Sequence, residues 1–118
     1  MKDNRKKGIG LAFALNGLKE AFLRERNFRI HLAVTVLVLL AGFLFQLAIF
    51  EWMFIILIIS IVLIVELVNS LMERIIDYVK PEFHPQAKII KDIAAAAVLI
   101  AAITSVIIGL FIFLPKIF

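Results

Sequence analysis

Twelve residues, Glu66-Leu-Val-Asn-Ser-Leu-Met-Glu-Arg-Ile-Ile-Asp77, follow directly on a long apolar run. On a helix, which turns about 100° per residue, four of their polar side chains fall within roughly 80° of one another: Glu66, Asn69, Glu73 and Asp77. The stretch therefore predicts a helix with one acidic face that begins where hydrocarbon is still close. A carboxylate near hydrocarbon costs free energy, so Glu66 is a candidate functional residue; the alternative is that it only marks the end of a membrane span.

The composition of the chain is that of an integral membrane protein. Of its 118 residues 64% are hydrophobic, and the mean hydropathy is +1.08, whereas soluble domains are about 45–50% apolar. The length leaves room for a single membrane-embedded domain over residues 1–118. The sequence contains no cysteine, which excludes a disulfide framework and a thiolate metal site.

Three apolar runs are long enough to cross a membrane, because about 20 helical residues span about 30 Å of hydrocarbon. We expect transmembrane helices at about 30–50, 52–79 and 88–114, preceded by a surface helix at about 9–27. The second span continues through Glu66 because its uncharged part alone is too short. The predicted fold class is thus an all-α membrane protein with an N-terminal amphipathic surface helix and three transmembrane helices per subunit.

The surface helix carries apolar residues on one face and polar residues on the other. The apolar positions follow the i, i+4, i+7, i+11 spacing of a helix: Leu11, Leu15, Leu18 and Phe22. The segment is too polar to span, so we expect it to lie in the plane of the lipid headgroups. The alternative is a soluble helix packed on a partner. On the polar face, Glu20 is expected to be solvated.

A few residues mark the ends of the spans. The chain turns near Ala48–Glu51, where Trp52 fits an interfacial anchor and Glu51 is exposed with no role assigned. This connection is short, so the first two spans are expected to be antiparallel neighbours. His31 is expected at headgroup level, and Pro115 is expected to end the last helix.

Basic residues gather before the first span and between the second and third, whereas the turn at Glu51 has no Lys or Arg. By the positive-inside rule, the N-terminus and residues 74–92 are cytoplasmic and the C-terminus is outside. A basic run that adjoins a membrane span favours anionic lipid headgroups as partners rather than nucleic acid. All the polar segments are therefore expected at one membrane face.

Carboxylates at a water–lipid boundary, with cations nearby, suit the binding of Mg²⁺ and phosphate, because Mg²⁺ takes one or two carboxylates plus substrate phosphates. Glu73 is one candidate ligand, and Glu20 or Glu25 could supply the second. Glu66, closer to the membrane, could act as general base toward a lipid hydroxyl, and Lys91 could neutralise phosphate charge. No Walker A sequence or kinase glycine-rich loop is present.

Several motifs also resemble those of a known family. They are Glu66-Leu-Val-Asn69-Ser70-x-x-Glu73-x-x-x-Asp77, Glu82-x-His84, Lys91-Asp92-x-Ala-x-Ala-Ala-Val and Gly17-Leu-Lys-Glu-Ala-Phe-x-x-Glu25-x-Asn-Phe-Arg29. In residue type, order and spacing they resemble the small integral-membrane lipid kinases of bacteria, the prokaryotic diacylglycerol kinases and undecaprenol kinases. The resemblance implies a homotrimer in the bacterial cell membrane with active sites at subunit boundaries, ATP as the phosphoryl donor and Mg²⁺ as the metal.

Position by position, the resemblance implies roles for the polar residues. Glu66 resembles the family's general base on the lipid hydroxyl, and Glu25 and Glu73 resemble the carboxylates that hold Mg²⁺ against the ATP phosphates. Asn69 resembles the residue that keeps the polar site in shape. The residues implied on the ATP-binding side are Lys6, Glu25, Asn69, Glu73, Asp77, Glu82, His84, Lys91 and Asp92.

Two departures from the enterobacterial members bear on the lipid. The surface helix has Ala14-Leu15-Asn16, more apolar than Ser-Trp-Lys, and the first span is entered through Arg29-Ile30-His31, which is more like the Gram-positive branch. That branch includes undecaprenol kinases, so we expect undecaprenol as the acceptor, with diacylglycerol as the alternative. Asn16 and Arg29 are accordingly placed with Glu66 on the lipid side.

A different class of function is a small proton-coupled transporter that uses Glu66. Transporters place their binding groups near the bilayer midplane, whereas here the acids lie toward one end of the spans. We therefore prefer the lipid kinase and keep the transporter as the distant alternative.

Overall fold

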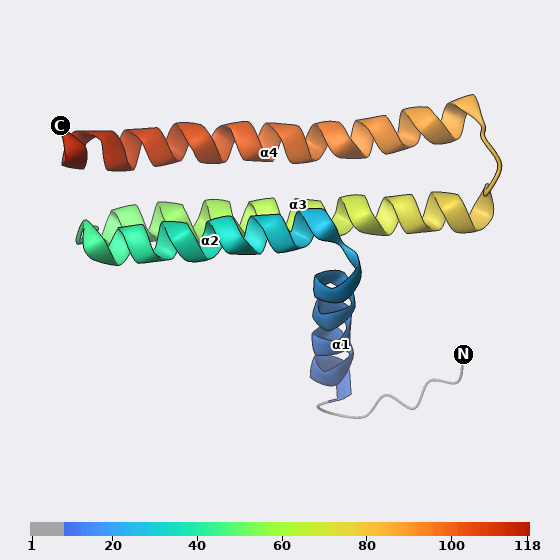
Figure 1. Ribbon diagram of the computed structural model, residues 1–118, viewed down its shortest axis with the longest axis horizontal. Coiled ribbons are helices and arrows are strands. Elements are labelled where there is room, and N and C mark those ends of the chain that lie inside the picture. Colours follow the sequence, from blue (N-terminus) through green and yellow to red (C-terminus); the bar gives the residue numbers. More distant parts are fainter. Residues whose placement is uncertain (1–8) are drawn as a thin grey trace.

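Residues 9–118 of the chain are described by the computed structural model, and they form four helices (Figure 1). These are α1 (Ile9–Arg24), α2 (Arg26–Leu44), α3 (Ile49–Val79) and α4 (Pro85–Ile117). Helices α2, α3 and α4 run alongside one another in alternating directions, and α1 lies crosswise to them at the start of α2 (Figure 1). The last three helices are long and apolar enough to cross a membrane, as the sequence predicts.

The three long helices differ in length, and this difference sets one end of the bundle apart. Helix α2 has 19 residues, about 28 Å at 1.5 Å per residue, which matches the hydrocarbon core of a bilayer. Helix α3 has 31 residues and α4 has 33, so both continue past α1 and the start of α2 (Figure 1). Glu66 lies about 25 Å from the start of α3, so the polar stretch that follows it lies near and beyond the start of α2.

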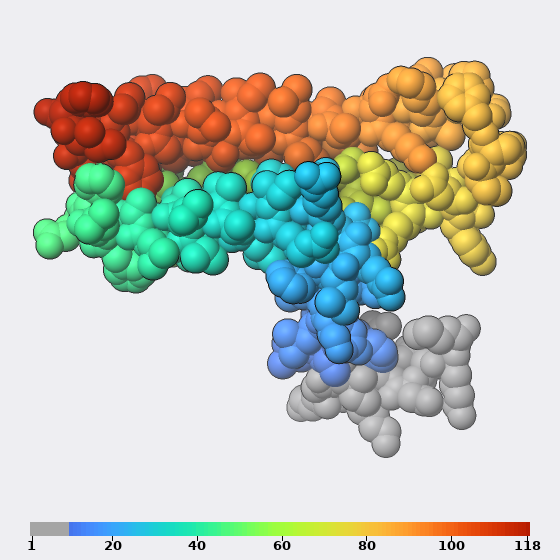
Figure 2. Space-filling model, in the orientation of Figure 1, coloured from blue at the N-terminus to red at the C-terminus, as the bar shows by residue number. Residues whose placement is uncertain are grey.

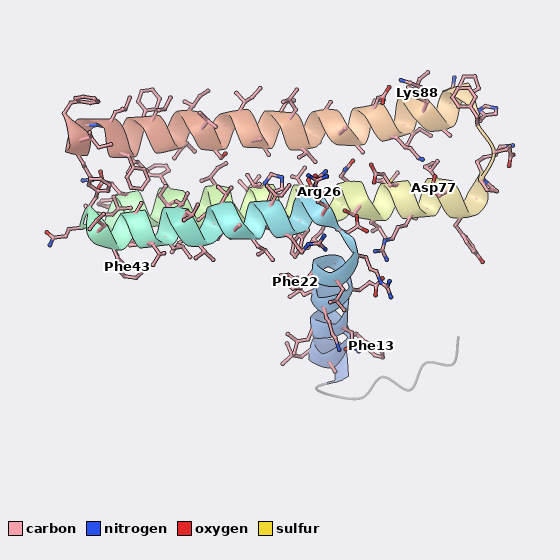
Figure 3. The ribbon with its side chains drawn as sticks, in the orientation of Figure 1. Phe13, Phe22, Arg26, Phe43, Asp77 and Lys88 are labelled. Carbon is pink, nitrogen blue, oxygen red and sulfur yellow. The ribbon has the colours of Figure 1, made fainter. Side chains whose placement is uncertain are left out.

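Helix α1 leaves most of its apolar side chains uncovered by the rest of the chain. Among residues 10–24 only Ala21 is buried, whereas Leu11 and Leu15 are 67% and 56% exposed. Phe22 lies on the side of α1 toward which α2 runs (Figure 3). This is the side that faces the bilayer if α2 crosses it, so the exposed apolar face fits the predicted surface helix.

The first two helices break earlier than the sequence predicts. The surface helix ends at Arg24, and the first span begins and ends before the predicted 30–50. Residues 45–48 make the turn, with Gln46 in the left-handed region at a φ of 53°, and α3 already begins at Ile49. The residues on both sides of this turn are apolar, so hydropathy alone does not place it.

Helix α4 is longer than predicted at both ends. It begins at Pro85, because proline suits the first helical position and the Nδ1 atom of His84 accepts a hydrogen bond of 3.1 Å from the backbone N–H of Gln86. Pro115 was expected to end the helix, but α4 continues to Ile117. The φ of proline is itself helical, so only one hydrogen bond is lost within the last turns.

Close contact between α2 and α3 depends on Gly42. The ring of Trp52 lies against this glycine, and its centroid is 4.9 Å from that of Phe43. A Cβ atom built on Gly42 would lie 2.6 Å from Cη2 of Trp52 and 3.1 Å from Cδ1 of Leu47. Trp52, predicted only as an interfacial anchor, therefore holds the α2–α3 hairpin together as well.

Glu51, which had no role assigned from the sequence, connects α3 to α4 at the end of the bundle farthest from α1. Its Oε1 atom accepts a 2.9 Å hydrogen bond from the backbone N–H of Ala48, which satisfies one of the free donors at the start of α3. The same atom lies 2.9 Å from Nζ of Lys116 in the last turn of α4. Figure 2 shows the C-terminal end of α4 packed against the α2–α3 turn.

Between these two ends, α3 and α4 pack through apolar side chains. The buried members of this layer are Ile55, Ile58 and Val62 from α3 and Ala101 and Ile112 from α4. Ala101 is a small residue, which lets α3 and α4 approach each other closely. The apolar layer ends one turn after Val62, at Glu66, where the polar face of α3 begins.

We predict that Gly42→Leu destabilises the fold, because the added side chain forces Trp52 away from α2. Overpacking of this kind costs about 1–3 kcal/mol, which is measured as a shift of the unfolding transition in mixed detergent micelles followed by circular dichroism. Gly109→Leu is the matched control, because a Cβ atom at that position meets nothing within 4 Å. Equal stability of the two variants would contradict the role of Gly42.

Candidate active site

Helix α3 makes a polar contact with each of the other three helices. Glu66 faces α2, Arg74 reaches α1 and Asp77 is bound from α4. The three residues follow one another along the stretch 66–77 that the sequence analysis singled out. The polar stretch of α3 is therefore where polar side-chain contacts join α3 to each of the other three helices.

Glu66 is almost completely buried, with 2% of its surface exposed. Its Oε2 atom lies 3.5 Å from Nε2 of His31 on α2. His31 was expected only at headgroup level, and its contact with this carboxylate was not foreseen. A buried carboxylate beside an imidazole can take up and release a proton without leaving the site.

Asn69 and Ser70, one turn beyond Glu66, are also buried. The Oδ1 atom of Asn69 is a buried acceptor with no hydrogen-bond partner among the described residues. Buried polar atoms are nearly always paired in folded proteins, because an unpaired one loses its hydration without compensation. Asn69 therefore offers an acceptor to a group from outside residues 9–118 of this chain.

Glu25 is the one non-helical residue between α1 and α2, and its backbone is extended. Its side chain does not cap α2. Instead, Arg74 on α3 donates to Oε2 of Glu25 from Nε at 3.1 Å and from Nη2 at 2.7 Å. Arg74 also donates from Nη1 to Glu20 at 3.2 Å. Glu20 was expected to be solvated, but its side chain is paired with this arginine.

The two predicted metal ligands, Glu25 and Glu73, lie in one region with Glu66. Glu73 is exposed, and the negative charges of both residues act on Glu66. Within residues 9–118 no three His, Asp or Glu side chains are grouped closely enough to hold an ion alone. Hard carboxylate oxygens suit Mg²⁺, which needs only one or two of them when substrate phosphates complete its shell. The donor set therefore fits Mg²⁺ bound together with a phosphate.

The two other residues predicted on the lipid side lie on or next to α1. Nη1 of Arg29 donates to the backbone carbonyls of Phe22 at 2.8 Å and Leu23 at 3.2 Å. These carbonyls are in the last turn of α1 and lack helical partners, so Arg29 caps the surface helix. Asn16 is exposed on α1, and its side chain makes no hydrogen bond within the described part of the chain.

Four of the nine residues predicted on the ATP-binding side line a cavity of about 200 Å³ between the ends of α3 and α4 and the loop that joins them. Its predicted members are Asp77, Glu82, His84 and Lys91. Nζ of Lys91 lies 2.5 Å from Oδ1 of Asp77. Figure 3 marks Asp77 at this end of the bundle, where α3 and α4 extend past α2.

The two predicted metal ligands, Glu25 and Glu73, are not in the lining of this cavity, and three further predicted residues are not in it either. Asp92 is bound by Lys88, whose Nζ lies 2.6 Å from its Oδ2. Asn69 lies deeper in the bundle, next to Glu66. Lys6 lies outside the described residues.

An apolar groove runs between α2 and α4 over the surface of α3. It has a volume of about 410 Å³ and begins at His31, the partner of Glu66. It continues toward the far end of the bundle, where Ile117 contributes to its wall. Apart from His31 at its polar end, the residues that line it are apolar except for Thr35 and Ser105, and Gly109 leaves open space in its wall. The buried carboxylate therefore lies where an apolar groove meets the polar face of α3.

His31 and Arg74 are the two residues of the site that the sequence analysis did not assign to it. Arg74 lies within the stretch 66–77, about 80° around the helix from Glu66, so a cation at the edge of an acidic face was a visible signal. For His31 the sequence held no such signal, because its contact with Glu66 depends on the register between α2 and α3. That register is fixed by the turn at 45–48.

Known proteins match the chain over most of its length. The family model for prokaryotic diacylglycerol kinase matches residues 12–113. The chain is 47% identical over 100 residues to an undecaprenol kinase of Bacillus subtilis (strain 168), covering 85% of this chain and 81% of that protein. It is 40% identical over 108 residues to a diacylglycerol kinase of Synechocystis sp., covering 91% and 62%. It is 36% identical over 96 residues to a diacylglycerol kinase of Escherichia coli (strain K12), covering 80% and 78%.

We predict that Arg29→Ala loosens the end of α1, because two carbonyls lose their donor. A lost hydrogen bond of this kind costs about 1 kcal/mol, so hydrogen–deuterium exchange of peptides from α1 should become about fivefold faster. Arg26→Ala is the matched control, since the Arg26 side chain has no hydrogen bond or ion pair within residues 9–118. Unchanged exchange in Arg29→Ala would show that the cap does not hold the helix.

Proposed function

The chain belongs to the prokaryotic diacylglycerol kinase family, and we propose that it is an undecaprenol kinase, which transfers the γ-phosphoryl group of ATP to the hydroxyl group of undecaprenol. The observation that carries this proposal is the buried carboxylate of Glu66 at the meeting point of an apolar groove and a polar face. The higher identity to the relative named undecaprenol kinase, 47% against 40% and 36% for those named diacylglycerol kinase, supports the polyprenol. Diacylglycerol is the alternative acceptor.

Glu66 is the proposed general base. Its carboxylate takes the proton of the lipid hydroxyl while the hydroxyl oxygen forms its bond to the γ-phosphorus of ATP. The bond between that phosphorus and the bridging oxygen of ADP breaks, and ADP leaves. His31, 3.5 Å from Glu66, holds the carboxylate in place. The apolar groove that begins at His31 would hold the lipid tail, so the hydroxyl is presented at its polar end.

Glu25 and Glu73 are the proposed ligands of Mg²⁺, and bound Mg²⁺ supplies neutralisation of the phosphate charge. Glu25 comes from the elbow between α1 and α2, and Glu73 comes from α3 two turns beyond Glu66. The loop cavity that Asp77 and Lys91 line is the proposed place for the nucleotide. The residues proposed on the ATP-binding side, besides the two metal ligands, are Lys6, Asn69, Asp77, Glu82, His84, Lys91 and Asp92.

The lipid side is proposed to include α1. Asn16 is exposed on this helix at the level of the polar site, where a lipid headgroup would lie. Arg29 acts there through the structure of α1, since its side chain caps the helix. A surface helix in the headgroup plane would then form one edge of the entrance for the acceptor.

We propose further that the protein works as a homotrimer whose active sites lie at subunit boundaries. The unpaired Oδ1 of Asn69 and the exposed apolar faces of α3 support contacts beyond one chain. The charge distribution supports a cytoplasmic N-terminus and active site and an outside C-terminus. Chemical cross-linking in mild detergent that gives only monomer would count against the trimer.

We predict that purified protein with ATP and Mg²⁺ labels undecaprenol faster than dioleoylglycerol in a radiolabelled phosphate transfer assay. Glu66→Gln should lower kcat by about 10²–10⁴-fold, because the amide cannot accept the proton, while the KM for ATP stays nearly unchanged. Preferential labelling of dioleoylglycerol would make diacylglycerol the acceptor in place of undecaprenol and would leave the proposed roles of the site residues unchanged. Equal turnover of wild type and Glu66→Gln would remove Glu66 as the base.

We predict that Gly109→Leu impairs use of the lipid, because Gly109 lines the groove and a Cβ there meets open space. Filling the groove should raise the KM for undecaprenol about tenfold, equivalent to about 1.4 kcal/mol, and leave the KM for ATP unchanged. Ala95→Leu adds the same side chain to an exposed position of α4 outside the groove lining and is the control. If both variants behave alike, the groove does not hold the lipid.

A further inference from the structure

Helix α1 faces α3 across a cavity of about 190 Å³, whose walls include Gly17 and Ala21 on one side and Leu67 and Leu71 on the other. Among residues 10–24 only Ala21 is buried, and the closest backbone contacts of α1 are with α2, the next helix in the chain. Arg74 joins the two sides of this cavity by binding Glu20 and Glu25 at the same time. The side chain of Glu25 is therefore held to α3 by this arginine.

The geometry at Glu25 is one-sided. Both hydrogen bonds from Arg74 end on Oε2, and no side-chain hydrogen bond within residues 9–118 ends on Oε1. The guanidinium fork is planar and rigid, so its two donors hold Oε2 of Glu25 in one place and leave Oε1 without a donor. Metal ligands are often held in this way by a residue that does not itself touch the metal. The second oxygen of the carboxylate then stays available to bind the metal.

We propose that Arg74 is a positioning residue for phosphoryl transfer, which docks α1 on α3 and holds Glu25 by one oxygen so that the other is left for Mg²⁺. This inference rests on the proposed function, in which Glu25 is a metal ligand. Arg74 does not touch substrate in this role; it acts through Glu25. Glu20 is the second anchor, which keeps the guanidinium from turning away.

The exposure of the cluster indicates that the role concerns geometry more than overall stability. The side chains of Arg74 and Glu20 are 45% and 50% exposed, whereas that of Glu25 is 21% exposed. Exposed ion pairs contribute little to the stability of a fold. Arg74→Gln should therefore fold normally, and its effects can be assigned to the position of α1 and of Glu25.

The docking of α1 can be measured directly, because the chain has no cysteine. Spin labels at Leu11→Cys on α1 and Tyr78→Cys on α3, which are 67% and 89% exposed in the wild type, give a distance distribution by double electron–electron resonance. Labelled protein is diluted with excess unlabelled protein so that only distances within one chain contribute. We expect Arg74→Gln to broaden the distribution and Arg74→Lys to restore it only in part, since lysine lacks the fork.

Metal binding is measured as the loss of free Mn²⁺ signal in the presence of the β,γ-imido analogue of ATP. We expect the Kd for Mn²⁺ to rise about 10–100-fold in Arg74→Gln, as for other residues that orient a metal ligand. The Mg²⁺ concentration for half-maximal transfer should rise in parallel. The KM for the lipid should stay unchanged.

Arg24→Gln is the matched control, since it removes the same charge from the same cluster. Arg24 only approaches Glu20 at 3.7 Å along α1, and within residues 9–118 it makes no hydrogen bond or ion pair with α3. It should leave both the distance and the Kd unchanged. Arg74→Gln with wild-type distance and Mn²⁺ binding, or with tighter Mn²⁺ binding, would overturn the proposal. Absence of phosphoryl transfer by the wild type would instead overturn the proposed function, and the distance measurement would still decide whether Arg74 docks α1.

Discussion

The burial of Glu66 is the constraint on which the rest of the polar site depends. A carboxylate at the edge of hydrocarbon loses most of its hydration, and in this fold His31 from α2 lies 3.5 Å from it as a polar neighbour. This contact forms in the register of α2 on α3 that the turn at 45–48 sets, and the same register places Glu25 beside the polar stretch. Gly42 supports this register at the far end, because a side chain there would collide with Trp52.

The unequal lengths of the helices turn this register into a site. Since α2 is about as long as hydrocarbon is thick, the extra turns of α3 and α4 carry Asp77, Lys91 and the joining loop into the polar region. Helix α1 closes the same end from the side (Figure 1). Apolar packing therefore fills the depth of the bundle, and the candidate site lies at the end where α1 joins the three long helices.

Much of this arrangement could be predicted from the sequence, because hydropathy and helical periodicity are local signals. They identified three spans, a surface helix and the acidic face from Glu66 to Asp77, and the matching family bears out the resemblance that the motifs suggested. The exact turns could not be found where both sides are apolar, as at 45–48. Partners such as His31 for Glu66, or Lys116 for Glu51, depend on how helices lie against one another, which no single segment encodes.

The polar contacts of the acidic face also hold the helices together. His31, Arg74 and Lys91 come from three different helices, and each lies against a carboxylate on a neighbouring helix. A cation or a polyphosphate bound at the proposed site would therefore change the charge around contacts that join the helices. The ion pairs of Arg74 and Lys91 are partly exposed and individually weak, whereas the apolar layer between α3 and α4 is buried. The helices are thus held more firmly in the apolar depth of the bundle than at its polar end.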